Sequence, residues 1–282
     1  MGMLQSTIVA NKLRITAVIS ASTTDSVLEP LTPRSIVLSV LLGSHPPRMP
    51  VGRILEFTSL FDLADGTVRT ALSRMVAAGD LINDDGIYRL AGRLVERQAQ
   101  QDAGRRLPPS DWDHTWWMVA VLSDRRTMAE RRAFRAWAIG ARLGELRPDL
   151  WLRPANLDIP TDLPHVLITR GSMISGAQQQ LVAHLWDLDA LRARSNVNRL
   201  ALDAAAARLG DPDDRSLADA FTALAAAQQF LRVEPQLPAN LTPHTIGDDV
   251  RMRYAEVVEV FQARLARFFA GRSAERVSTT AP

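Results

Sequence analysis

The stretch that decides the fold runs from Asp65 to Leu90 and reads "DGTVRTALSRMVAAGDLINDDGIYRL". Its first half places apolar residues at helical spacing, and Gly79 follows at the position where many helices end. Its second half has short apolar segments on both sides of "DDG", which is typical of a tight hairpin turn. The stretch therefore predicts a helix that begins at a capping Asp65, followed by a hairpin.

Two shorter helical patterns precede this stretch. "TPRSIVLSVLLG", from Thr32 to Gly43, has a capping threonine, a proline suited to a first turn, a glycine at its end and one apolar face. "VGRILEFTSLF", from Val51 to Phe61, follows a proline-rich break. Three short helices followed by a hairpin are the order of elements in a winged helix-turn-helix.

The helix that begins near Asp65 has two different sides. Val68, Leu72, Met75 and Val76 cluster on one side and predict its buried face. The opposite side has hydroxyl and arginine residues and no carboxylate, so it can approach phosphates and base edges without repulsion. The candidate DNA-binding residues on this side are Thr67, Arg69, Thr70, Ser73 and Arg74. An ordinary solvated helix surface is the alternative interpretation.

The rest of this region is not strongly basic. Asp84 and Asp85 fall at the predicted hairpin tip, where phosphates would repel them, so we expect this short wing to stay out of the minor groove. Arginines barely outnumber acidic residues between residues 28 and 107. DNA binding would therefore depend on local arginines, and we add Arg34, Arg48 and Arg53 to the candidate residues.

The second half of the chain changes character twice. After a polar connector that ends at "PPS", the segments "HTWWMVAVL", "MAERRAFRAWAIGARLG", "LWLRPAN" and "HVLITRGSM" predict a β-α-β-β series. This order suggests half or more of a ferredoxin-like unit. From Gly176 onward the chain is alanine-rich with apolar stripes at helical spacing, which predicts a helical region whose stripes are core.

At "FDLADGTVRTALSRMVAAGDL" followed by "IYRL", the sequence resembles the PaaX-type transcriptional repressors of aromatic-acid catabolism. The phrase G-x-L-x-P-x-x-W-x-R-P, from Gly144 to Pro154, is also similar to that family. The resemblance extends from about Leu31 to Leu265. It implies a homodimer that represses transcription and leaves its double-stranded operator DNA when it binds an aryl-acyl-CoA such as phenylacetyl-CoA.

The resemblance and the patterns together predict an α+β protein with a winged helix-turn-helix, a ferredoxin-like (Cas2-like) middle domain and a helical C-terminal domain. The resemblance also implies that Val68 and Leu72 belong to the helix core, whereas Arg69, Thr70, Ser73 and Arg74 face or support DNA contacts. The expected segments are a flexible arm (1–27), the winged-helix DNA-binding domain with its connector (28–107), the Cas2-like domain (108–175), the helical domain (176–272) and a disordered tail (273–282).

Composition excludes several other classes of protein. Hydrophobic residues make up 46% and charged residues 23% of the 282 residues, which is the mix of an ordinary globular protein. The absence of cysteine excludes disulfides, thiolate zinc sites and thiol nucleophiles. No apolar stretch approaches the roughly 20 residues needed to span a bilayer, so we expect a cytoplasmic protein without a membrane partner.

A second group of arginines lies in "RRTMAERRAFRAW". Arg131 and Arg135 are four residues apart and share a helix face, with Arg132 beside them. These three residues are the candidate effector site, as a clamp for the phosphates of an acyl-CoA or of DNA beside the wing. The alternative is an ordinary solvated helix surface. The tryptophans of this half could line an aromatic pocket or, as we expect for most of them, form core.

The main alternative from another class is a Cas2-like, metal-dependent nuclease with Asp124 as a ligand. One carboxylate is too few for such a site, and the five histidines have no ligand spacing. We therefore expect no enzyme activity, catalytic residue, metal or cofactor. A regulator of another pathway, with a different acyl-CoA or a carboxylate as effector, stays open. So does a protein-interaction scaffold, which would have no salt-dependent DNA affinity.

Overall fold

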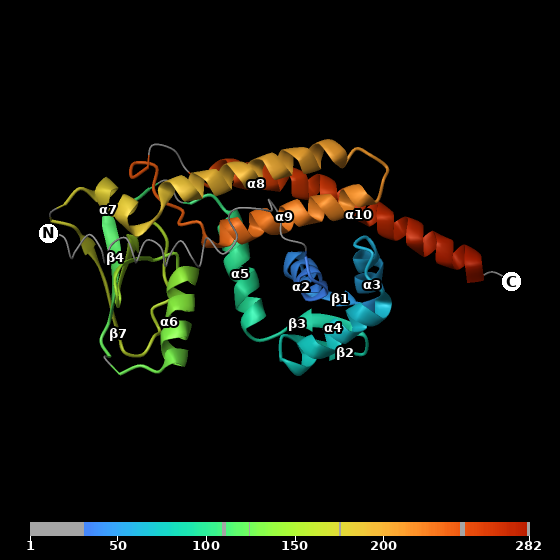
Figure 1. The fold of residues 1–282 in the computed structure, drawn as a ribbon, viewed down its shortest axis with the longest axis horizontal. Coiled ribbons are helices and arrows are strands. Elements are labelled where there is room, and N and C mark those ends of the chain that lie inside the picture. Colours follow the sequence, from blue (N-terminus) through green and yellow to red (C-terminus); the bar gives the residue numbers. More distant parts are fainter. Residues whose placement is uncertain (1–30, 109–110, 124, 175, 243–245, 281–282) are drawn as a thin grey trace. The chain divides into compact units, whose positions relative to one another are not determined.

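The structure is a computed structural model that describes residues 31–280 except 109–110, 124, 175 and 243–245 (Figure 1). It is a mixed α+β protein with two small antiparallel sheets and a helical C-terminal region. Its described residues divide into two compact units. The three-stranded unit consists of Pro30–Arg106, Val197–Arg232 and Asp249–Pro282, and the four-stranded unit of Leu107–Asn196 and Val233–Asp248. The predicted arm, residues 1–27, lies outside the described residues.

The three-stranded unit contains the helices and the hairpin predicted for the first part of the chain. Its sheet has the strand order β1-β3-β2 with antiparallel pairing, and the short β1 was not predicted. The elements are α2 (Pro33–Gly43), β1 (Arg48–Pro50), α3 (Val51–Ser59), α4 (Asp65–Ala77), β2 (Leu81–Asp84), β3 (Ile87–Leu90) and α5 (Arg93–Arg105).

Helix α2 is the central helix of this unit. The hydroxyl of Thr32 accepts a hydrogen bond from the Ser35 amide at 3.1 Å, which confirms the predicted cap. The sequence predicted one apolar face, but Leu38 and Leu42 are buried as well. A helix that is apolar on most of its surface has neighbours on most sides, so α2 holds the unit together rather than presenting a surface.

The hairpin has the predicted turn. Asp85 and Gly86 both have positive φ, 49° and 83°, as a type I′ turn requires. The side chain of Asn83 accepts a hydrogen bond from the Gly86 amide at 3.0 Å. The turn fixes the register in which Asp84 lies opposite Ile87.

The four-stranded unit has a sheet with the strand order β5-β6-β4-β7, antiparallel throughout. It contains the three predicted strands and the predicted helix, but β5, which lies between that helix and β6, was not predicted. The link from β6 to β7 contains no helix. The elements are β4 (Thr115–Val121), α6 (Met128–Gly140), β5 (Gly144–Arg147), β6 (Leu150–Pro154), β7 (Val166–Ser172) and α7 (Gln178–Leu185).

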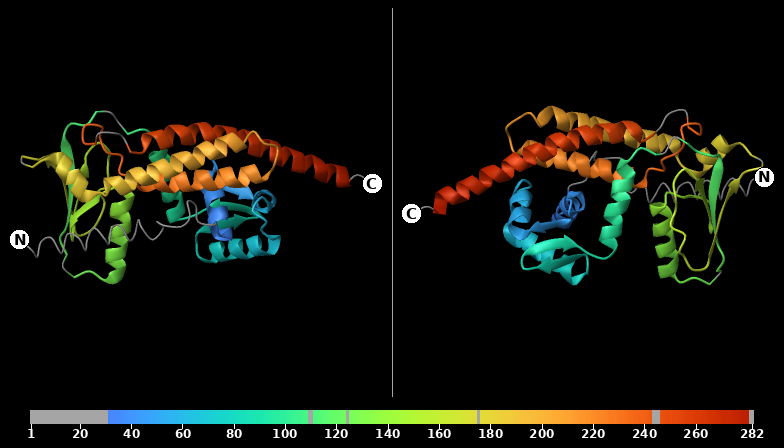
Figure 2. Two further views of the ribbon diagram at one scale, coloured as in Figure 1. Left: turned by 45° about the horizontal axis from the view of Figure 1, so that its top comes forward. Right: turned by 180° about the vertical axis from the view of Figure 1, so that it is seen from behind.

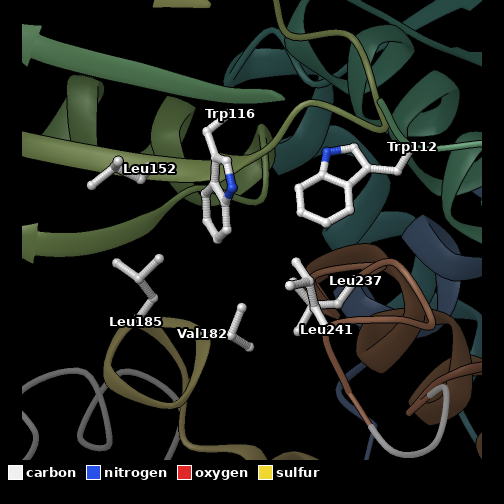
Figure 3. Close-up of a cluster of buried hydrophobic side chains, with 7 residues drawn as sticks. All are labelled: Trp112, Trp116, Leu152, Val182, Leu185, Leu237 and Leu241. Atoms are coloured by element: carbon white, nitrogen blue, oxygen red, sulfur yellow. The ribbon is translucent and has the colours of Figure 1, made fainter. Parts of the chain in front are cut away.

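Side chains alternate between the two faces of this sheet. Val119 and Trp151 point to the face covered by α6, where they pack with Ala138. Trp116 and Leu152 point to the other face. Figure 3 shows the second cluster, in which the strands, α7 and the segment after α9 meet. Its buried members are Trp112, Trp116, Leu152, Val182, Leu185, Leu237 and Leu241. Tryptophans of this unit thus form core.

The family-like phrase from Gly144 to Pro154 has a structural explanation. A Cβ on Gly144 would lie 2.7 Å from the Cβ of Leu185, so α7 packs directly on this backbone. Arg153 is only 1% exposed and donates to the Ala141 carbonyl at 3.1 Å. Burial, and secondarily nearby Arg142, lower the pKa of Arg153 to about 9. The phrase therefore encodes a close approach and a buried arginine.

The C-terminal region supplies α8 (Leu188–Arg208), α9 (Arg215–Val233) and α10 (Asp248–Thr280), drawn from yellow to red in Figure 2. The predicted stripes are core: Leu217 and Leu224 of α9 and Val257 and Phe261 of α10 are buried. Helix α10 includes most of the residues predicted as a tail. Among the described residues, none of the helices has the length and hydropathy needed to cross a bilayer.

Candidate nucleic-acid interface

Helix α4 begins one residue before the predicted position. Its N-cap is Ala64, and Asp65 is the first helical residue, so the prediction that Asp65 caps the helix was wrong. Ala64 has extended dihedral angles but no side chain that can accept a hydrogen bond. The Asp65 carboxylate instead lies in the first turn, where it interacts favourably with the positive end of the helix dipole.

The end of α4 is held by a Schellman motif. Gly79 has φ of 70°, and its amide donates to the Val76 carbonyl at 2.9 Å. The Asp80 amide donates to the Met75 carbonyl at 2.9 Å. The predicted glycine end is confirmed, and the motif directs Asp80 into the interior of the unit.

The two sides of α4 differ as predicted. Val68, Leu72 and Met75 are at most 1% exposed. The opposite side is exposed, and its five candidate residues are Thr67, Arg69, Thr70, Ser73 and Arg74. The Thr70 hydroxyl donates to its own helix, at the Gly66 carbonyl, and keeps its lone pairs for another donor.

The arginines on this side have no polar partner within the described chain. Neither Arg69 nor Arg74 forms a hydrogen bond or ion pair with a described residue. No carboxylate occurs in the sequence between Asp65 and Asp80. The exposed side of α4 is therefore a surface with two unneutralised guanidinium groups and several hydroxyls, which suits an anionic, hydrogen-bonding partner.

Two of the other candidate arginines have partners. Arg34 donates to the buried Asp80 carboxylate at 2.6 Å. Arg53 forms a 3.4 Å ion pair with Glu56, and its guanidinium lies 4.5 Å from the centre of the Phe269 ring. Both residues thus take part in contacts within the three-stranded unit.

Arg48 differs from these two. It is exposed on β1 opposite Arg89 and has no ion pair among the described residues. Arg89 itself pairs with Asp84 at 2.8 Å, on an exposed side of the hairpin. Asp84 therefore has a local counter-charge, which the sequence pattern did not reveal because the pair forms only when the hairpin closes.

Asp80 is a structural residue that the sequence analysis missed. Its side chain is 3% exposed and accepts hydrogen bonds from Arg34 at 2.6 Å and from Arg93 at 3.2 Å. Burial alone would raise the pKa of Asp80, but the two arginines outweigh burial and hold the pKa below its usual value. This carboxylate connects the end of α4 to the starts of α2 and α5.

The candidate effector arginines lie on α6 of the four-stranded unit. Arg135 forms a 2.8 Å ion pair with Glu145 and lies over the Trp151 ring at 5.5 Å. Arg131 and Arg132 are exposed and have no ion pair with a described residue. The structure thus leaves two of the three guanidinium groups accessible.

The nuclease alternative named Asp124 as a metal ligand. Asp124 lies outside the described residues. Elsewhere in the described part of the chain, no three histidine, aspartate or glutamate side chains are grouped as a metal site would need.

Comparisons with known proteins agree with the sequence resemblance. A family model described as "PaaX-like protein" matches residues 32–94, from α2 to the start of α5. The solved structure of "Uncharacterized protein Rv0674 from Mycobacterium tuberculosis" is similar to this chain, with 32% sequence identity and a TM-score of 0.64. The match covers 85% of this chain and 99% of that one. A search among curated proteins found no match.

Proposed function

Because the chain belongs to the family of PaaX-like proteins, which implies a transcriptional regulator, we propose that it is a dimeric, sequence-specific repressor of an aromatic-acid catabolic operon. In this proposal, helix α4 reads the operator and an aryl-acyl-CoA such as phenylacetyl-CoA releases the protein from it. The observation that carries the proposal is the exposed side of α4, where Arg69 and Arg74 have no partner among the described residues.

Several features support a winged helix-turn-helix. Helices α2, α3 and α4 are followed by the β2-β3 hairpin, and β1 completes the sheet. In such a fold the last helix before the hairpin lies in the major groove. The inner side of α4 packs into the unit, so its other side is the side that a groove would meet.

The candidate residues take different parts in this proposal. Arg74 and Arg69 can contact guanine edges or phosphates, and the hydroxyls near them can bind either base or backbone. Arg48, which is exposed beside the hairpin, contacts a DNA phosphate next to the groove in this proposal. Arg34 and Arg53 already hold ion pairs, so we assign them to positioning the helices rather than to reading bases.

The proposed dimer would use the four-stranded unit. Its strand order and antiparallel pairing are those of a ferredoxin-like sheet with one crossover helix, which supports the Cas2-like identity. Strand β7 is at an edge of this sheet, and Leu167 and Met118 on the face away from α6 are 50% and 42% exposed. A second copy that covers this face of β4 and β7 would bury them. The two copies of α4 would then read half-sites one or more helical turns apart.

The effector would bind through the accessible arginines of α6. Arg131 and Arg132 can bind the phosphates of an acyl-CoA, while Arg135 is held by Glu145. Binding can release DNA only if the acyl-CoA has a higher affinity for a dimer in which the two α4 helices are misaligned. The residues themselves do not distinguish phenylacetyl-CoA from another acyl-CoA.

The test is a fluorescence anisotropy titration of the full chain against DNA from upstream of its own and adjacent genes. It is run at two salt concentrations, with and without phenylacetyl-CoA. We expect specific binding that weakens with salt and is lost when the acyl-CoA is added. Affinity for these fragments equal to that for random DNA, at both salt concentrations, would contradict the proposal.

Two variants separate its parts. Arg74→Ala should weaken operator binding, whereas the double variant Arg131→Ala, Arg132→Ala should bind the operator normally and resist release by the acyl-CoA. Each variant removes charge from a different unit, so each is the control for the other. Release of the double variant at wild-type acyl-CoA concentrations would remove α6 from the effector site.

A further inference from the structure

Helices α5 and α9 meet within the three-stranded unit (Figure 1). The Gln228 side chain of α9 donates to the Gln101 carbonyl of α5 at 3.2 Å. It also accepts a hydrogen bond from Arg105 at 3.0 Å. Arg97 lies one turn before Gln101 on α5, and Arg232 lies one turn after Gln228 on α9. The crossing of the two helices therefore brings these two arginines to the same region.

Neither arginine has a partner in the described chain. Both are half-buried, and the Nε atom of each is inaccessible to solvent and makes no hydrogen bond. A guanidinium that loses water without gaining an acceptor costs free energy. Two such groups in one region are a feature that packing does not explain.

Further positive charge surrounds them. Arg93 lies four residues before Arg97, on the same face of α5, and shares the Asp80 carboxylate with Arg34. Burial lowers the pKa of Arg97, and the charges of Arg232, Arg34 and Arg93 lower it further. Burial also lowers the pKa of Arg232. Of these four guanidinium groups, two share one carboxylate and two have none within the described residues.

We infer that the arginine cluster Arg34, Arg93, Arg97 and Arg232 is a binding site for a phosphate group. Guanidinium groups bind phosphate oxygens in bidentate fashion, and a dianion bound by these side chains would reduce the repulsion among the four positive charges. The phosphate belongs to a small phosphorylated molecule or to a DNA backbone. This inference does not rest on sequence-specific reading by α4, and the site is in a different unit from the arginines of α6.

The experiment measures binding of inorganic phosphate and pyrophosphate to the full chain by calorimetry and by thermal unfolding, in chloride buffer at constant ionic strength. We expect pyrophosphate to raise the Tm of the wild type. Arg97→Met and Arg232→Met should each weaken pyrophosphate binding by at least about tenfold. Both variants should fold in the absence of phosphate, because each loses a half-buried charge that has no partner in the described chain.

Two further variants complete the test: the first is a matched control, and the second removes a competing negative charge. Arg215→Met removes the same charge at the other end of α9, about 26 Å along the helix from Arg232, and should bind pyrophosphate as the wild type does. Asp80→Asn removes the competing carboxylate and should bind pyrophosphate more tightly. No rise in wild-type Tm, or equal affinities in the Arg97, Arg232 and Arg215 variants, would overturn the inference.

A competition with duplex DNA of unrelated sequence identifies the source of the phosphate. If the duplex displaces pyrophosphate and Arg97→Met lowers the salt dependence of duplex binding, the site holds a backbone phosphate. If pyrophosphate and the duplex bind at the same time, the site takes a small phosphorylated molecule. Both outcomes support a phosphate site, and they differ only in the ligand that carries the phosphate.

Discussion

Replacing Asp80 with asparagine tests how the end of helix α4 is anchored to α2 and α5. The substitution keeps the shape of the side chain and removes its charge, so the hydrogen bonds from Arg34 and Arg93 lose their ionic character. Hydrogen bonds to charged groups contribute about 1.5 to 3 kcal/mol each. The side chains of Arg34 and Arg93 are 54% and 78% exposed, so hydrogen bonds to water can replace part of the lost interaction with Asp80. We therefore expect Asp80→Asn to lower the free energy of unfolding by about 2 to 3 kcal/mol at neutral pH.

The stabilisation by the Asp80 carboxylate should depend on pH. The pKa of Asp80 in the folded protein lies below its ordinary value of about 3.9. Its stabilising contribution is therefore complete above that value and is lost as the pH falls through the folded-state pKa. The stability difference between wild type and Asp80→Asn should shrink as the pH is lowered below about 4.

The assay is urea unfolding followed by circular dichroism, at neutral pH and at steps down to the lowest pH at which both proteins fold. The matched control is Asp84→Asn, which removes an exposed ion pair of the same unit and should change stability by less than about 1 kcal/mol. The reasoning is refuted if Asp80→Asn lowers the free energy of unfolding by no more than the control does at neutral pH. A difference that stays constant down to acid pH would show that the charge is not the cause.

Three further predictions concern single positions. Arg74→Ala should weaken specific operator binding by about 1 to 3 kcal/mol if Arg74 contacts a base, measured by anisotropy against random DNA, and unchanged affinity would exclude it from the interface. Gly144→Ala should lower stability by about 1 to 3 kcal/mol in urea unfolding because α7 leaves no room for a methyl group. Gly171→Ala, which meets nothing within 4 Å, is its control, and equal effects would contradict the close approach. Thr32→Ala should cost about 1 kcal/mol through loss of the α2 cap, and a thermal scan with no loss would show that the cap is dispensable.

The parts of the fold that the sequence predicted are those fixed by local chemistry. The helical spacing around Val68 and Leu72, Gly79 at the end of α4 and the "DDG" turn each need only neighbouring residues, and the structure has all of them. The N-cap was predicted at Asp65 because aspartate is a good cap, although the chain enters the helix one residue earlier. Strand β1 was missed because a segment of three residues carries no periodicity.

The parts that the sequence could not predict depend on distant partners. Arg34 pairs with Asp80, 46 residues later in the chain, so no local pattern separates it from Arg74. Leu38 and Leu42 of α2 are buried because helices surround α2, whereas its sequence shows one clear apolar face. The side chains that carry candidate binding chemistry are distinguished by tertiary contacts rather than by residue type.

Net charge therefore says little about what this protein can bind. The first region of the chain has nearly equal numbers of arginines and acidic residues. Two of its carboxylates form ion pairs within the three-stranded unit: Asp80 pairs with Arg34 and Arg93, and Glu56 pairs with Arg53. Each carboxylate used in this way removes negative charge from the surface. The arginines that remain, on the exposed side of α4, face solvent without a neutralising neighbour on the same side of the helix. Affinity for a polyanion depends on those unpaired groups, so a nearly neutral region can still present a local phosphate-binding surface.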